Sequence, residues 1–153
     1  PDFYAMYVIN YVFGAQMTSR LMMNLRQEKG YSYGYYAQID WLKGSSSLIA
    51  GGSVQTDVTK DALAETLKEF TDIRRGRPIT EEEFENAKDG ILQGFPSQFE
   101  TQRQILQQLA HVAIFGLPDD YYANFLDNIE ALGLDVRAHC PFCAQQAQSC
   151  AVH

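Results

Sequence analysis

Residues 20–33, RLMMNLRQEKGYSY, decide how the rest of the chain is interpreted. Leu21, Met22 and Leu25 recur at about helical spacing, so we expect them to face a core. Gly30 should end this helix, because glycine adopts the left-handed backbone conformation at little cost. The aromatic run that follows it favours a strand. The stretch therefore predicts a helix, a tight turn and the first strand of a hairpin.

Three cations occupy this stretch. We expect Arg20, Arg26 and Lys29 in or just past the last turns of the helix, where positive charge is favourable. Arg26 would then be fixed on a rigid helix end, with Tyr33 just across the turn. A guanidinium and a phenol held in this way can point into one space.

Three separated motifs give the chain a resemblance to a known family. Residues 20–33, with Asn10-Tyr-Val-Phe-Gly ahead of them, closely resemble the insulinase/pitrilysin and mitochondrial-processing-peptidase family, the inverted zincins. The segments GFPSQFET at 94–101 and FGLPDDY at 115–121 also resemble it and occur in the family's order. The resemblance runs from about Pro1 to Arg137.

The resemblance implies which half of the peptidase this chain is. Members contain repeats of one domain: one repeat carries a zinc-binding H-x-x-E-H helix, and the other carries an Arg and a Tyr, seven residues apart, that reach across to the zinc. Arg26 and Tyr33 have that spacing. The three histidines, His111, His139 and His153, do not form H-x-x-E-H. The chain is therefore identified as the domain without the zinc motif, with no metal or cofactor of its own.

The function implied by the resemblance is the zinc-free half of a zinc metallopeptidase, inactive alone. Tyr33 would donate to the oxyanion, and Arg26 would hold the substrate backbone or orient Tyr33. The expected partners are a zinc-bearing H-x-x-E-H domain or subunit and a peptide substrate; a homo-oligomer stays open. The alternative is a catalytically inactive structural or interaction subunit of the same fold. Without the resemblance, physical chemistry favours simpler roles, with Arg26 as a helix-capping cation and Tyr33 as an ordinary aromatic residue of a strand.

Composition bounds the class of protein. A chain of 153 residues with 46% hydrophobic residues is one globular domain with a real core. The net charge of −7 argues against a nucleic-acid partner. The sequence contains no run of about 18 apolar residues, so no membrane span is predicted. No signal peptide is visible. The resemblance alone suggests a bacterial periplasm or cell envelope.

The fold class follows from two strands and the helices after them. Tyr33 to Leu42 alternates, with Tyr33 and Tyr35 on one face and Tyr36 on the other. A turn leads to a second strand over 47–55, so we expect an antiparallel hairpin. Four or five helices follow, which predicts an α+β fold whose antiparallel sheet is covered on one face by helices. The family pattern includes further strands, so a truncated copy is expected.

Several local features carry alternatives. Gly51-Gly52 indicates a bulge, or a backbone or bound chain approaching closely. The acidic run after Thr80 could suggest a metal, but a capping box with Glu83 explains it. His111 has no ligand partner one turn away, so a surface or core-edge position is favoured. Two apolar stripes are expected to face the core, one on each of two helices: Leu63, Leu67, Phe70 and Ile73, and Phe99, Ile105, Leu106 and Leu109.

The last residues depart from the family pattern. We assign residues 1–137 to the metallopeptidase-like domain, as part of a longer domain, and treat 138–153 as an off-pattern tail. All three cysteines lie there, with Cys140 and Cys143 at C-x-x-C spacing. The tail is compatible with zinc binding, a redox pair, or an altered reading frame or cloning scar. The last is favoured, and the tail is left out of the fold argument.

Overall fold

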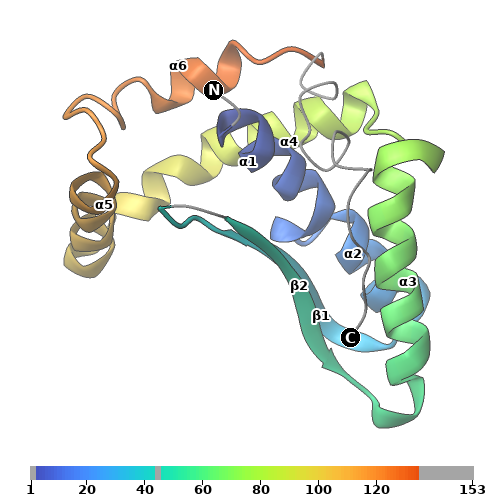
Figure 1. Ribbon diagram of the computed structural model, residues 1–153. Helices are drawn as coiled ribbons and strands as arrows, with labels where there is room; N and C mark the ends of the chain where they lie inside the picture. Colours follow the sequence, from blue (N-terminus) through green and yellow to red (C-terminus); the bar gives the residue numbers. More distant parts are fainter. Residues whose placement is uncertain (1–2, 44–45, 135–153) are drawn as a thin grey trace.

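The computed structural model describes residues 3–43 and 46–134 (Figure 1). The N-terminal helical segments are α1 (Phe3–Asn10), η1 (Tyr11–Ala15), α2 (Arg20–Met22) and η2 (Met23–Glu28). Two strands follow, β1 (Ser32–Asp40) and β2 (Ser47–Val54). The remaining helical segments are η3 (Thr56–Val58), α3 (Thr59–Thr71), η4 (Asp72–Gly76), α4 (Glu81–Gly94), η5 (Phe95–Phe99), α5 (Gln102–Phe115) and α6 (Phe125–Glu130).

The hairpin is antiparallel, as predicted, and its pairs run from Asp40 with Ser47 to Ser32 with Val54. Figure 1 shows it arching along α1 and α2, with α3 beside them. Along β1, Tyr35 is buried against the helices and Tyr36 is exposed. The α+β prediction, an antiparallel sheet with helices on one face, is confirmed. Within the described residues the sheet has two strands.

Two hydrophobic clusters form the core. The first surrounds α1 and includes Val8, Ile9, Phe84, Ala87, Ile91 and Ile129. The second joins the hairpin to the neighbouring helices and includes Phe13, Leu21, Leu25, Tyr35, Ala37 and Ala62. Leu21, Met22 and Leu25 are fully buried, as their spacing predicted. Each large apolar side chain buried in this way contributes about 1.5–3 kcal/mol.

The segment η1 lies directly on β1. A Cβ at Gly14 would lie 2.4 Å from the Cβ of Ala37, so only glycine allows this approach. Asn10 on α1 also donates from Nδ2 to the Ala37 carbonyl at 3.3 Å. This close approach fixes the helices ahead of η2 against the strand.

Arg20 does not lie near the end of its helix, so that prediction is wrong. It is the first residue of α2 and is buried. Its guanidinium binds the carboxylate of Glu83 and donates to the Pro78 carbonyl at 3.1 Å. Glu83 also forms the predicted capping box with Thr80 at the start of α4. Arg20 is therefore a structural residue that joins two helix starts.

The predicted inner face of α3 is only partly correct. Leu63 and Leu67 are exposed, whereas Thr66 and Glu69 are buried. The Thr66 hydroxyl lies 3.0 Å from the Tyr35 hydroxyl, so a polar contact turns this face of α3 toward the hairpin. The apolar period alone could not predict that rotation, because it depends on a partner strand.

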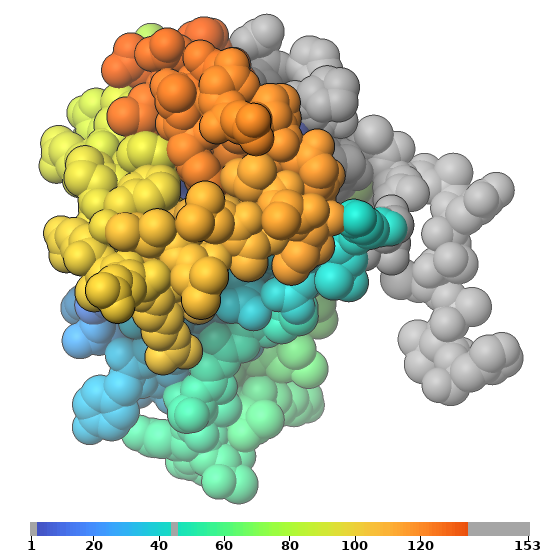
Figure 2. All heavy atoms as spheres, turned by 90° about the vertical axis from the view of Figure 1, so that its left-hand side faces the viewer, coloured from blue at the N-terminus to red at the C-terminus, as the bar shows by residue number. Residues whose placement is uncertain are grey.

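The predicted inner face of α5 is also wrong, although Phe99 of the stripe lies on the preceding η5 and packs against the first cluster. No residue of α5 is buried, and Figure 2, turned toward this side of the molecule, shows the helix on the surface. Its exposed apolar side chains are Ile105, Leu106, Leu109 and Ile114. The helix begins with a capping box in which the Thr101 hydroxyl accepts from the Gln104 amide and the Gln104 side chain accepts from the Thr101 amide. Within the described residues, the main neighbour of α5 is the adjoining η5.

Candidate functional site

The helix that carries Arg26 ends in a π-helical turn. The Lys29 amide donates to the Asn24 carbonyl at 3.0 Å, and the Tyr31 amide donates to the Leu25 carbonyl at 2.9 Å. Gly30 has φ 65°, so it ends the helix as predicted. The π geometry of η2 was not predicted; such turns are rare and often occur at functional sites.

Polar contacts clamp this helix end to α3. Asn24 is buried and donates from Nδ2 to Glu65 at 3.1 Å and to Glu69 at 2.8 Å. The hydrogen bond from Asn24 lowers the pKa of Glu65, and Lys29, 3.6 Å away, acts in the same direction. Both carboxylates belong to α3, so these contacts fix the backbone beside Arg26 to that helix.

Arg26 and Tyr33 line the same open hollow, of about 530 Å³, at the end of the hairpin. Arg26 is half-buried on η2, and Tyr33 is 95% exposed on β1. The other residues lining the hollow are Gln27, Gly30, Tyr31, Ser32, Ser53, Val54 and Gln55. The structure thus brings the two sequence-predicted site residues to one space, with polar and aromatic surroundings.

A methionine sulfur contacts the Arg26 side chain. Arg26 Nη1 lies 3.7 Å from Sδ of Met17, and the Tyr36 hydroxyl lies 3.6 Å from the same sulfur. A thioether is a weak acceptor, whereas a guanidinium carries five N–H donors. Met17 therefore takes up one donor of Arg26 only weakly.

Tyr33 does not share a face with Tyr35, which corrects the predicted alternation. In β1, Ser32 and Tyr35 are three positions apart, whereas their partners Val54 and Gly52 in β2 are two positions apart. This β-bulge adds one residue to β1. Because strand side chains alternate with period two, the extra residue puts Ser32 and Tyr35 on the buried side and leaves Tyr33 outside.

The close approach at the bulge requires a glycine at position 52 of β2 but not at position 51. A Cβ at Gly52 would lie 2.2 Å from the Gly34 carbonyl oxygen, while one at Gly51 would meet nothing within 4 Å. The predicted bulge is found opposite Gly52, although the extra residue belongs to β1. The predicted close approach of a backbone is found at the same glycine. Ser32, which bonds across the bulge, was missed, because its role depends on a contact with Ser53 of the other strand.

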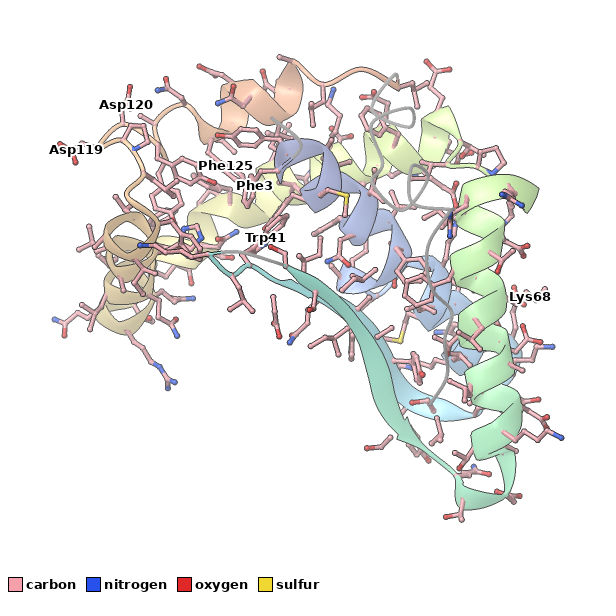
Figure 3. The ribbon with its side chains drawn as sticks, in the orientation of Figure 1. Phe3, Trp41, Lys68, Asp119, Asp120 and Phe125 are labelled. Atoms are coloured by element: carbon pink, nitrogen blue, oxygen red, sulfur yellow. The ribbon has the colours of Figure 1, made fainter. Side chains whose placement is uncertain are left out.

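His111 lies at an aromatic surface cluster away from this hollow. Its Nδ1 is 3.3 Å from the Tyr122 hydroxyl, and burial lowers its pKa. The cluster also holds Phe3, Trp41 and Phe125, seen together in Figure 3. The Phe3 and Trp41 ring centroids are 4.6 Å apart. The predicted core-edge position of His111 agrees with this half-buried site.

Within residues 3–43 and 46–134, no group of three or more His, Cys, Asp or Glu side chains could hold a metal ion. None of the helices in these ranges combines the length and apolar character needed to cross a bilayer. The cysteine tail, with Cys140 and Cys143, lies outside the described residues.

Curated relatives carry peptidase-related names. Over 87 residues the chain is 33% identical to "Uncharacterized zinc protease YmxG" of Bacillus subtilis, covering 56% of this chain and 21% of that protein. Over 132 residues it is 28% identical to "Non-peptidase homolog YmxG" of Helicobacter pylori, covering 83% of this chain and 29% of that protein. The chain thus spans less than a third of the length of either relative.

Solved structures show the same fold. A peptidase M16 inactive domain from Pseudomonas fluorescens matches with a TM-score of 0.77 at 22% identity, covering 91% of this chain and 33% of that one. An inactive peptidase domain from Bordetella parapertussis matches with a TM-score of 0.72 at 17% identity, covering 94% and 77%. The family model described as "Peptidase M16 inactive domain" matches residues 1–91. The chain therefore belongs to the peptidase M16 inactive domain family.

Proposed function

We propose that this domain supplies the non-metal side of a peptidase cleft, with the zinc held by an H-x-x-E-H domain or subunit that faces it. The observation that carries the proposal is the placement of Arg26 and Tyr33 on one open hollow. Residues 1–137 would form this half, as part of a longer domain. Family membership supports the pairing, because the family's name describes an inactive domain of a peptidase.

Tyr33 would act on the transition state. As water adds to a peptide carbonyl, negative charge grows on the carbonyl oxygen. An exposed phenol on a fixed strand can donate to that oxygen, and it stabilises the transition state more than the ground state. The 95% exposure of Tyr33 supports this role, because a side chain packed inside the domain could not reach a peptide held by another domain.

Arg26 would bind the substrate backbone or orient the Tyr33 phenol. Its guanidinium offers several donors in a planar fork, which can bind peptide carbonyl groups. The clamp of Asn24 on Glu65 and Glu69 holds the helix that carries it. A donor that is already positioned loses little entropy when a peptide binds.

The test mixes the chain with a purified subunit that carries H-x-x-E-H and follows cleavage of quenched fluorescent peptides. We expect cleavage in the mixture that exceeds cleavage by either component. Tyr33→Phe should lower kcat by about 10²–10³ with little change in KM, as for the loss of one oxyanion donor. Arg26→Ala should raise KM as well, because substrate contacts are lost.

Matched controls lie away from the hollow. Tyr4→Phe removes a phenol on α1, and Arg103→Ala removes an exposed guanidinium on α5. Both variants should cleave peptides at the wild-type rate. If Tyr33→Phe and Arg26→Ala retain wild-type rates in an active mixture, the proposed catalytic contribution is wrong.

A second candidate is a structural or interaction subunit. It is favoured by the name of the Helicobacter pylori relative, a non-peptidase homologue, and by the exposed apolar face of α5 in this chain. Sedimentation of the same mixture separates the two functions. A stable complex that cleaves no peptide would support the structural role.

A further inference from the structure

We infer that Ser32 is a positioning residue, which holds the bulge in β1 and thereby directs the Tyr33 side chain toward the hollow. This inference rests on the proposed function of Tyr33. Ser32 is only 8% exposed, and it stands immediately before Tyr33. Its hydroxyl lies 2.7 Å from the Ser53 carbonyl and 2.8 Å from the Gly34 carbonyl. It also accepts from the Gly34 amide at 3.1 Å.

These contacts satisfy backbone groups that a bulge leaves without ladder partners. A bulge opposes two residues to one, so the normal pairing is lost there. The Ser32 hydroxyl has one proton and two lone pairs. It can donate to one carbonyl at a time while it accepts from the Gly34 amide. One side chain thus joins β1 to β2 across the irregular register.

Loss of this hydroxyl would favour a regular ladder. Buried backbone groups without partners are costly, and re-pairing the strands would satisfy them. Removing the extra residue from the ladder moves the side chains before it to the other face. Tyr33 would then turn toward the face that carries Tyr35, away from a peptide in the hollow.

The experiment compares Ser32→Ala with Ser32→Thr, which keeps the hydroxyl, and with Ser47→Ala. Ser47 is an exposed serine at the other end of β2. In the full chain, hydrogen exchange of the Gly34 amide should quicken by about tenfold or more in Ser32→Ala, because its acceptor is lost. In fluorotyrosine-labelled protein, the ¹⁹F signal of position 33 is assigned by its absence in Tyr33→Phe. Its chemical shift should change in Ser32→Ala and remain unchanged in Ser47→Ala.

The paired assay gives the functional measurement. With an H-x-x-E-H subunit, Ser32→Ala should lower kcat by about 10–100-fold through misplacement of Tyr33, and Ser32→Thr should recover most of it. An unchanged Gly34 exchange rate and Tyr33 signal in Ser32→Ala would overturn the inference. So would full activity of Ser32→Ala when Tyr33→Phe is impaired. Insensitivity to Tyr33→Phe itself overturns the proposed function instead.

Discussion

Arg20 holds both carboxylate oxygens of Glu83, which lies 63 residues further along the chain. Arg20 Nε lies 2.8 Å from Oε1, and Nη2 lies 2.7 Å from Oε2. The Arg77 and Pro78 carbonyls accept from the same guanidinium. Since Arg20 is 4% exposed, this pair fixes the start of α2 to the start of α4 and joins the two halves of the core.

Glu83→Gln tests the energetic weight of this pair. Glutamine keeps a capping side chain for Thr80 but removes the charge, so the buried guanidinium loses its counter-charge. The Glu83 side chain is 33% exposed, which moderates the effect. We expect the free energy of unfolding to fall by about 2–4 kcal/mol in urea denaturation. Glu82→Gln, at an exposed neighbouring position, should change it by less than about 0.5 kcal/mol. Equal effects in the two variants would contradict the prediction.

The same carboxylate predicts a pH dependence. Burial alone would raise the pKa of Glu83, but hydrogen bonds from Arg20 and Thr80 outweigh it and lower the pKa to about 2 from 4.5. The folded value lies below the unfolded one, so the stabilisation is complete above pH 4.5 and is lost as the pH falls toward 2. The melting temperature of the wild type should therefore fall more steeply across this pH window than that of Glu83→Gln. Parallel curves would argue against the shift.

The features that could be predicted from the sequence are those with local signals. Gly30 is identified by the helix before it and the aromatic run after it, and it has the expected positive φ. Thr80 and Glu83 are three residues apart, so their capping box is visible in the sequence. The motif spacing predicts Arg26 and Tyr33 as a pair, and the turn at Gly30 explains why both line one hollow.

What could not be predicted depends on residues distant in the sequence. The bulge beside Tyr33 exists because a carbonyl of β1 approaches Gly52 of β2, and alternation along one strand carries no such information. Arg20 pairs with Glu83 instead of capping its own helix. Leu67 was expected inside, but Glu69 faces inward to meet Asn24. In each case a tertiary contact overrides the local pattern.

The two adjacent glycines of β2 should respond differently to alanine. In Gly52→Ala the new Cβ meets the Gly34 carbonyl, a backbone atom that cannot move without disturbing the bulge. We expect a loss of about 1–3 kcal/mol, the usual cost of overpacking. Gly51→Ala meets open space and should be neutral or stabilising by up to about 1 kcal/mol. Thermal denaturation followed by circular dichroism measures both variants, and a tolerated Gly52→Ala would show that the bulge is not tightly packed.

Leu106→Ala tests whether the apolar face of α5 is exposed to solvent, and Leu21→Ala is the comparison for a buried leucine. Leu21 is fully buried, so Leu21→Ala should cost about 2–5 kcal/mol. Leu106 is 66% exposed, so Leu106→Ala should change the free energy of unfolding by less than about 0.5 kcal/mol. Measurement at several protein concentrations adds a second criterion, because self-association through this face would make the midpoint depend on concentration. A large cost for Leu106→Ala together with such dependence would mean that a second copy of the chain covers α5.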